Sequence, residues 1–364
     1  MSSPRLPEAQ RLASSNAESG KSTPLLRARK GRLGALEPAR LLIVNERSAE
    51  PQELTSVLTS RDLLVINDAA TLPASLPVMF FGALPGELRL TEAPTRTATG
   101  KARVTAVLFG SGDFRTPTEA RLPPPRVAVG ATVQFRSVTL RVIRVSALST
   151  RLVTMESSES FEQLVAALYR HGSVVQYAYV PNALHLWDAQ TSFARVPFAV
   201  EAPSATYLLP RALPCDAVFL SHAAGLSDTG DASLNAQLPF PERYVIPAET
   251  ASAIERAKNR GGKVIAVGTS VTRALETAAR KANSDAAGRL HVGPGTSDLH
   301  IGAATERRVV DGIVTGVHDV ATSHRSLLTA FVSASALTRA YARSQALALY
   351  THEFGDGWLV LPER

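Results

Sequence analysis

The order in which strand and helix patterns follow one another most limits how this 364-residue chain can fold. Short apolar runs near 41–44 and 62–67 indicate buried strands. From about 77 to 177 the pattern changes to short β-rich runs separated by Gly and Pro. The clearest of these runs, 103–109 and 132–145, interleave β-branched and polar residues as half-buried antiparallel strands do. This middle segment is typical of a small β-barrel or sandwich.

Beyond the β-rich middle, strand and helix patterns alternate. Pro247 can open a helix that ends at 261–262, and a buried strand at 263–268 follows it. A longer helix is expected at about 323–349, before a final strand at 358–361. Strands that alternate with helices pair in parallel and carry the helices on the outside of the sheet.

We therefore predict an α/β fold with two domains. An α/β domain is formed by 40–76 and 179–364, and a smaller antiparallel β domain, 77–178, a barrel or a sandwich, is inserted in it. Residues 1–39 form a basic leader, because the first 40 residues hold eight Lys and Arg side chains against three Glu, most of the formal charge of +7. Such a leader is either an electrostatic arm toward a polyanion or a solvated, mobile tail.

Composition narrows the class of protein. Hydrophobic residues make up 45% of the chain, enough to bury a sizeable core and to exclude disorder throughout. The single cysteine, Cys215, excludes an intrachain disulfide and a Cys-rich metal site. No run approaches the roughly 18 apolar residues of a membrane span, and the first residues lack the apolar core of a signal peptide. We expect a soluble, cytoplasmic protein.

The junction of strand and helix at Gly268 and Thr269 is a candidate binding site. A strand that turns there into a helix directs backbone N–H groups and the positive end of the helix dipole to one point, where anions bind. Arg273 in the first turn needs an anionic neighbour, either Glu276 or a bound phosphate or carboxylate. The alternative is a capped helix with a surface ion pair. Without a G-x-G-x-x-G or Walker-type loop, no dinucleotide or NTP cofactor is expected.

Histidines stand beside polar groups in three other segments. The turn before the last strand suits acid/base catalysis, although the same residues also form turns. The segments 220–227 and 318–324 place His222 and His318 beside hydroxyls, and a hydrogen-bonded structural role is the alternative for each. The candidates in the turn are His352, Glu353, Gly355 and Asp356.

Taken together, six blocks occur in the order and spacing of one family. They are 62–74, 201–205, 241–247, 266–277 (Ala-Val-Gly-Thr-Ser-Val-Thr-Arg-Ala-Leu-Glu-Thr), 310–318 (Val-Asp-Gly-Ile-Val-Thr-Gly-Val-His) and 352–356 (His-Glu-Phe-Gly-Asp). The chain resembles the S-adenosylmethionine:tRNA ribosyltransferase-isomerase family of queuosine biosynthesis. The resemblance runs from about 40 to 362, and the β-rich middle is its least distinctive part.

The resemblance implies an activity and a fold. The family transfers and isomerises the ribosyl part of S-adenosylmethionine onto 7-aminomethyl-7-deazaguanine in the tRNA anticodon, giving epoxyqueuosine and releasing adenine and methionine. S-adenosylmethionine is then a substrate rather than a cofactor, tRNA is the partner, and no metal or membrane is involved; a monomer is expected. An α/β barrel-like domain with an inserted β-barrel is also implied.

The resemblance assigns roles to matching positions. Three are expected to act as acid/base or charge-stabilising groups: Glu242, His318 and Asp356. The donor carboxylate or an RNA phosphate would bind at Gly268, Thr269 and Arg273, and the nucleoside pocket would be shaped by Pro203, Ser204 and Ala205. The other expected substrate-binding residues are Asn67, His222, Glu276, His352, Glu353 and Gly355.

Two blocks depart from the family pattern, at 203–209 and at 220–227. The first lacks the family's usual glycine and histidine, and in the second only one histidine and one glycine can be placed. These departures indicate a divergent member of the family and leave two alternative functions open. The chain is either a paralogue that uses the same donor on another nucleoside or small-molecule acceptor, or a catalytically silent RNA-binding homologue. Fold alone does not separate them.

Overall fold

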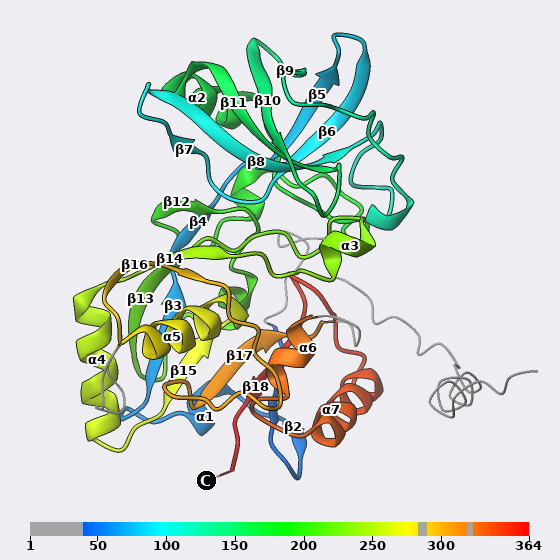
Figure 1. Ribbon diagram of the computed structural model, residues 1–364. Helices are drawn as coiled ribbons and strands as arrows, with labels where there is room; N and C mark the ends of the chain where they lie inside the picture. Colours follow the sequence, from blue (N-terminus) through cyan, green and yellow to red (C-terminus); the bar gives the residue numbers. More distant parts are fainter. Residues whose placement is uncertain (1–38, 283–289, 319–322, 364) are drawn as a thin grey trace, which may run out of the picture.

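The computed structural model describes residues 39–282, 290–318 and 323–363. The predicted basic leader, apart from residue 39, lies outside the described residues. Two large sheets dominate this part of the chain. Figure 1 shows a barrel of strands at the top, the larger sheet with its helices at the bottom, and the short pair β4 (Ala69–Thr71) and β12 (Val196–Ala199) between them.

The larger sheet draws its strands from both ends of the described chain. At its centre β3 pairs in parallel with β13 and β15, and β15 pairs in parallel with β17. The carboxyl ends of these four strands therefore lie at one edge of the sheet. In spatial order, the nine strands found among the described residues are β16 (Gly293–Ser297), β14 (Glu242–Ile246), β13 (Asp216–His222), β3 (Leu63–Asn67), β15 (Val264–Val267), β17 (Gly312–Gly316), β18 (Gly357–Val360), β1 (Leu41–Val44) and β2 (Ala49–Pro51).

Strand β3 is an uninterrupted apolar run because both of its faces are buried. Leu63 and Val65 pack into a core on one face of the sheet, whereas Leu64 and Ile66 pack into a core on the other. Successive side chains point to opposite faces of a strand, so both faces must be covered. The first face is covered by α4 (Ala248–Asn259) and α5 (Thr269–Lys281), and the second by α1 (Leu54–Val57) and the 3₁₀ turn η5 (Ser204–Leu208).

The smaller sheet is a barrel made from one continuous stretch of chain. Pairing of β11 with β8 closes six of its strands around a core that includes Phe80, Phe109 and Phe135. Its seven described strands, in spatial order, are β11 (Leu152–Ser160), β10 (Val138–Val145), β9 (Thr132–Phe135), β5 (Ser75–Phe80), β6 (Leu84–Leu90), β8 (Lys101–Phe109) and β7 (Thr95–Arg96). After β11, Ser160 and Gln163 form a capping box that starts α2 (Phe161–His171).

Five further elements complete the described residues. They are α3 (Ala232–Asn235), α6 (Ser323–Leu328), α7 (Ala334–Ala346) and the 3₁₀ turns η3 (Thr118–Ala120) and η4 (Leu186–Asp188). None of the helices in the described ranges combines the length and the apolar character that crossing a bilayer requires.

The predicted fold class, an α/β fold with an antiparallel β-barrel, is confirmed, with three local differences. Strands β16 and β2 are the edges of the larger sheet and do not pair with each other in the described residues, so this sheet is open rather than barrel-like. The strand expected at 132–145 is a hairpin of β9 and β10. The helix expected at 323–349 is two helices, because Ser333 caps α7 by accepting a hydrogen bond from the backbone N–H of Ala336 at 3.2 Å. The domain boundaries at 77 and 178 stay a prediction.

Candidate active site

A cavity of about 820 Å³ lies at the carboxyl ends of β13, β15 and β17. Segments that follow these strands form one wall, including Gly225, Gly268 and His318. η3, which lies between the barrel strands β8 and β9 in the sequence, contributes Thr118 and Glu119 to the lining. We call this cavity the cleft. Its position follows the rule that open α/β sheets bind ligands beyond the carboxyl ends of their strands.

The start of α5 lines the cleft as the strand-to-helix pattern predicts. Gly268 is the N-cap residue and has a φ of 99°, a backbone conformation that residues with a side chain rarely adopt. A Cβ atom built there would lie 3.4 Å from the Cβ of Ala205. Thr269 and Ser270 also line the cleft, so the N–H groups of the first turn border a space in which an anion can bind.

Arg273, one turn into α5, forms a buried ion pair with Glu242 of β14. Its Nε also donates to the carbonyl oxygen of Leu299 at 3.1 Å. Glu242 Oε1 accepts a hydrogen bond from the backbone N–H of Gly225 at 2.6 Å. Burial raises the pKa of Glu242, and the Arg273 charge and the Gly225 N–H oppose that rise. Both partners line the cleft and give it a fixed pair of opposite charges.

Glu276, one of the alternatives considered for the partner of Arg273, makes other contacts. The carboxylate of Glu276 is fully buried and accepts hydrogen bonds from the backbone N–H groups of Val309 and Val310, each at 3.0 Å, and from Arg280 at 2.7 Å. Glu276 does not line the cleft. Its contacts hold the segment before β17 against α5, which is a structural role.

His222 lies behind the ion pair, at the end of β13. Its side chain is fully buried, with Nε2 3.5 Å from Glu242 Oε2. Burial, and then the charge of Arg273, lowers the pKa of His222 to about 3, so its ring is neutral at physiological pH. Asn67 binds the backbone of His222 twice, by donating to its carbonyl oxygen at 3.0 Å and by accepting from its N–H at 2.9 Å. Neither residue lines the cleft, and Asn67 instead joins β3 to β13.

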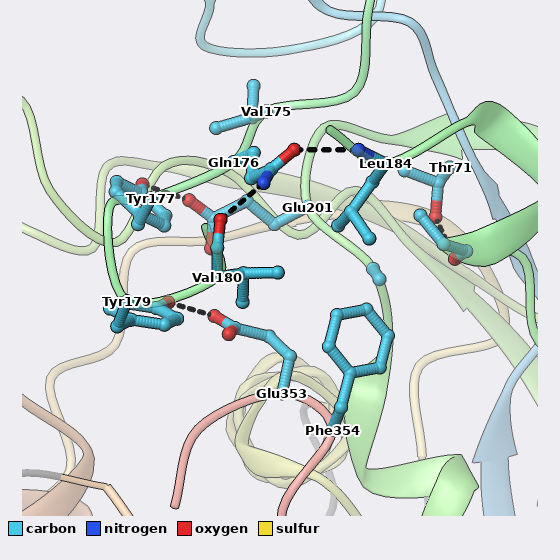
Figure 2. Close-up of a pocket in the computed structure, with 12 residues that line it drawn as sticks. Thr71, Val175, Gln176, Tyr177, Tyr179, Val180, Leu184, Glu201, Glu353 and Phe354 are labelled. Carbon is cyan, nitrogen blue, oxygen red and sulfur yellow. Dashed lines mark hydrogen bonds between the residues drawn. The ribbon is translucent and has the colours of Figure 1, made fainter. Parts of the chain in front are cut away.

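Two tyrosine–carboxylate pairs form the floor of the cleft. Figure 2 shows the hydroxyl groups of Tyr177 and Tyr179 directed at Glu201 and Glu353. Tyr179 donates to Glu353 at 2.5 Å, and its ring stacks on that of His352 with centroids 3.8 Å apart. These residues line the cleft, and all but His352 also enclose a small side chamber of about 30 Å³.

Glu201 is the carboxyl group best suited to proton transfer. Burial, with a further contribution from the charge of Glu353, raises the pKa of Glu201 to about 7, against the hydrogen bonds from Tyr177 and Ser227. Burial raises the pKa of both tyrosines well above the usual value, so they stay hydrogen-bond donors. A carboxyl group that titrates near neutral pH inside a cleft can both accept and donate a proton.

His318 follows β17 and faces the cleft beside a second histidine. Its ring stacks on His324, with centroids 4.2 Å apart. Burial, followed by the nearby histidines, lowers the pKa of His318 well below the usual value, and burial, followed by Arg273, lowers that of His324 to about 4. Both rings are therefore neutral, and they can donate or accept hydrogen bonds without carrying charge.

Asp356 does not line the cleft, and its expected catalytic role does not fit its contacts. Its fully buried carboxylate accepts from the backbone N–H and the guanidinium of Arg40 and from the backbone N–H of Tyr350. Gly355 is also a turn residue, because a Cβ there would lie 2.5 Å from the carbonyl oxygen of Thr351. Both residues build the turn that presents His352 and Glu353 to the cleft.

The structure thus brings most of the predicted site residues to one cleft and leaves five outside it, namely Asn67, His222, Glu276, Gly355 and Asp356. Those in its wall are Pro203, Ser204, Ala205, Glu242, Gly268, Thr269, Arg273, His318, His352 and Glu353. Sequence reasoning missed Glu201, Tyr177, Tyr179 and His324 as functional candidates. Glu201 stands in a block that carried the resemblance, but nothing in the sequence showed that it would be buried with the two tyrosines.

Comparison with known proteins identifies the family. The sequence profile described as queuosine biosynthesis protein matches residues 33–360, most of the chain. The chain belongs to this family. An S-adenosylmethionine:tRNA ribosyltransferase-isomerase of Gloeobacter violaceus is 32% identical, over 89% of this chain and 89% of that protein. One of Acaryochloris marina is 31% identical, over 89% and 88%. A crystal structure of S-adenosylmethionine tRNA ribosyltransferase from Thermotoga maritima aligns over 90% of this chain and 96% of that chain, with a TM-score of 0.44 and 19% identity.

Proposed function

We propose that this queuosine biosynthesis protein is an S-adenosylmethionine:tRNA ribosyltransferase-isomerase. It would transfer and isomerise the ribosyl part of S-adenosylmethionine onto 7-aminomethyl-7-deazaguanine in a tRNA anticodon, with release of adenine and methionine. The observation that carries the proposal is the cleft itself: an anion-binding helix start, a buried Glu242–Arg273 pair and the carboxyl groups of Glu201 and Glu353 share one cavity. Relatives that bear this enzyme name cover most of the chain.

The proposed reaction requires a base, a group that stabilises the sulfonium and a site for the donor carboxylate, and residues of the cleft can fill these roles. A proton must leave the C5′ carbon next to the sulfonium, and a carboxylate that titrates near neutral pH is a suitable base. We assign this step to Glu201, and we assign to Glu353 the stabilisation of the positive sulfonium. The methionine carboxylate of the donor would bind the first turn of α5, near Thr269 and Arg273.

Departure of adenine requires a hydrogen-bond donor at the nucleobase. His318 is neutral and lines the cleft, so its ring N–H can supply that hydrogen bond. The 3₁₀ turn at Ser204 and Ala205 would shape the pocket for one of the two bases. We further propose that the enzyme acts as a cytoplasmic monomer without a metal.

One reaction tests the proposal. The purified protein is incubated with S-adenosylmethionine and tRNA that carries the deazaguanine precursor, the RNA is digested, and its nucleosides are examined by mass spectrometry. Epoxyqueuosine and an equal amount of free adenine are expected. A parallel reaction with the free modified base tests a small-molecule acceptor. Absence of both the nucleoside and adenine would refute the enzymatic function, and RNA binding alone would then favour a silent homologue.

A further inference from the structure

Trp187 is an exposed aromatic residue that the proposed reaction does not use. It lies in η4 and is 65% exposed, although a tryptophan side chain usually buries most of its large apolar surface. Its ring stacks on that of His185, which is also exposed; the ring centroids are 4.4 Å apart and the planes differ by 15°. The two rings together form a flat pair that is open to solvent.

The backbone that carries the pair is firmly held. The side chain of Gln176 donates to the carbonyl oxygens of Val180 and Asn182, each at 2.6 Å, and accepts from the N–H of Leu184 at 3.0 Å. The N–H of His185 donates to the buried carboxylate of Asp188 at 2.8 Å. The exposed rings are thus presented by an ordered turn, so little conformational entropy would be lost when a ligand stacks on them.

The residues that directly follow η4 are hydrogen-bonded to Thr71, in the segment that leads into the barrel. The hydroxyl of Thr71 donates to the carbonyl oxygen of Ala189 at 3.0 Å, and the side chain of Gln190 donates to the carbonyl oxygen of Thr71 at 2.8 Å. Leu184 and Ala189, which flank the pair, line the small chamber in Figure 2. Tyr177, Tyr179, Glu201 and Glu353 line both this chamber and the cleft, so the chamber beside the turn adjoins the cleft.

We propose that Trp187, backed by His185, is a stacking platform for an unpaired base of the RNA substrate, next to the nucleotide that enters the cleft. Single-stranded RNA is recognised chiefly by stacking of its bases on aromatic side chains. The pair matches one base in size, whereas a stable protein partner would need a far larger apolar area. The exposed residues that precede the pair in the chain, Pro181, Asn182 and Ala183, carry no large apolar side chain.

The proposal deepens the proposed function and rests on it for the identity of the RNA, but RNA binding can be measured without S-adenosylmethionine. The probe is a synthetic RNA hairpin with an unpaired loop, and a fully paired duplex of the same composition is its reference. Trp187→Leu removes the platform, Trp187→Phe keeps an aromatic face, and Tyr169→Leu removes an aromatic residue that is 45% exposed on α2.

We expect Trp187→Leu to weaken hairpin binding about tenfold, the usual effect of losing one base-stacking contact. Trp187→Phe should recover most of the affinity, and Tyr169→Leu should match the wild type. In turnover assays Trp187→Leu should raise KM for tRNA and leave KM for S-adenosylmethionine unchanged. Tryptophan fluorescence gives a direct signal, since the chain has only one other tryptophan, the buried Trp358. Binding of the hairpin should quench the tryptophan fluorescence of the wild type more than that of Trp187→Leu.

Equal hairpin affinity of the wild type and Trp187→Leu, or no quenching that depends on Trp187, would overturn the platform even if the enzyme makes epoxyqueuosine. Conversely, hairpin binding that depends on Trp187 in a protein that releases no adenine would keep the platform and refute the ribosyl transfer.

Discussion

Asp356 and Arg40 are joined by hydrogen bonds across almost the whole described chain. Oδ1 of Asp356 accepts from the backbone N–H of Arg40 at 2.8 Å, and Oδ2 accepts from its guanidinium, also at 2.8 Å. The same guanidinium donates to the carbonyl oxygens of Leu347 and Ala348 at 2.9 and 2.7 Å. This carboxylate fixes the beginning of β1 to the turn before β18.

Asp356→Asn should therefore act on stability. We expect the variant to lose roughly 2–3 kcal/mol of unfolding free energy, because a buried charged acceptor is replaced by a neutral amide that also brings two donors. Urea denaturation at neutral pH measures the change. The folded fraction should keep near-normal turnover, and a variant with wild-type stability but no activity would restore Asp356 to the catalytic residues.

The proximity of Glu201 and Glu353 leads to a prediction about the pH dependence of kcat/KM. If ionised Glu201 is the base, kcat/KM should rise with pH and level off above about 7, the pKa of that group. Glu353→Gln removes a negative charge that helps to raise this pKa, so the rise should move to lower pH. Glu201→Gln should abolish turnover, and a Glu353→Gln profile that coincides with the wild type would contradict the coupling.

Glu201 should also make folding stability depend on pH. Its pKa is about 7 in the folded protein and near 4.5 when exposed, so the folded state holds the proton more tightly. The stabilisation is complete below about pH 4.5 and is lost as pH rises through about 7. Denaturation midpoints of the wild type and Glu201→Gln, compared at several pH values, measure this contribution. The difference between the two proteins should change with pH in that interval and be constant above it.

Arg273 and Glu242 should behave as a coupled pair. Arg273→Met leaves a buried carboxylate without its counter-charge and should cost about 3–5 kcal/mol of stability. Adding Glu242→Gln should recover part of this loss, because the uncompensated charge is gone. A double-mutant cycle by chemical denaturation measures the coupling. Strict additivity of the two single changes would show that the pair is not energetically linked.

Gly268 can be tested against a matched glycine. Gly268→Ala forces a side chain onto a φ of 99° and should cost about 1–2 kcal/mol. Gly261→Ala meets the same kind of strain at a φ of 74°, but with nothing within 4 Å of the new Cβ. Only Gly268→Ala should weaken binding of S-adenosylmethionine, measured by calorimetry. Equal effects of the two variants on binding would place the donor site elsewhere.

Patterns in the local sequence correctly predicted those strands and helices whose formation depends on residues close together in the chain. The apolar run at 264–267 and the glycine after it do form a strand that turns into a helix, and α4 follows Pro247. The break between α6 and α7 was missed because apolar spacing continues through it, although Ser333 is a good N-cap residue.

Long-range partners could not be predicted in this way. Arg273 pairs with Glu242, 31 residues earlier, rather than with Glu276, because the contact depends on how β14 packs beside α5. The pKa of Glu201 depends on burial beneath Tyr177 and Tyr179, and no single-sequence pattern reports that burial. The cleft could be located from strand ends, but its charges required the tertiary structure.

The position of β18 between β17 and β1 has a consequence for synthesis of the protein. The barrel strands come from one uninterrupted stretch, so they can associate while translation is still under way. β1 and its neighbour β2 emerge from the ribosome early, but the neighbour of β1 on its other side, β18, is made some 310 residues later. We therefore expect the nascent chain to carry an unfinished sheet edge until β18 has emerged, which makes this part of the molecule the one that needs chaperone protection.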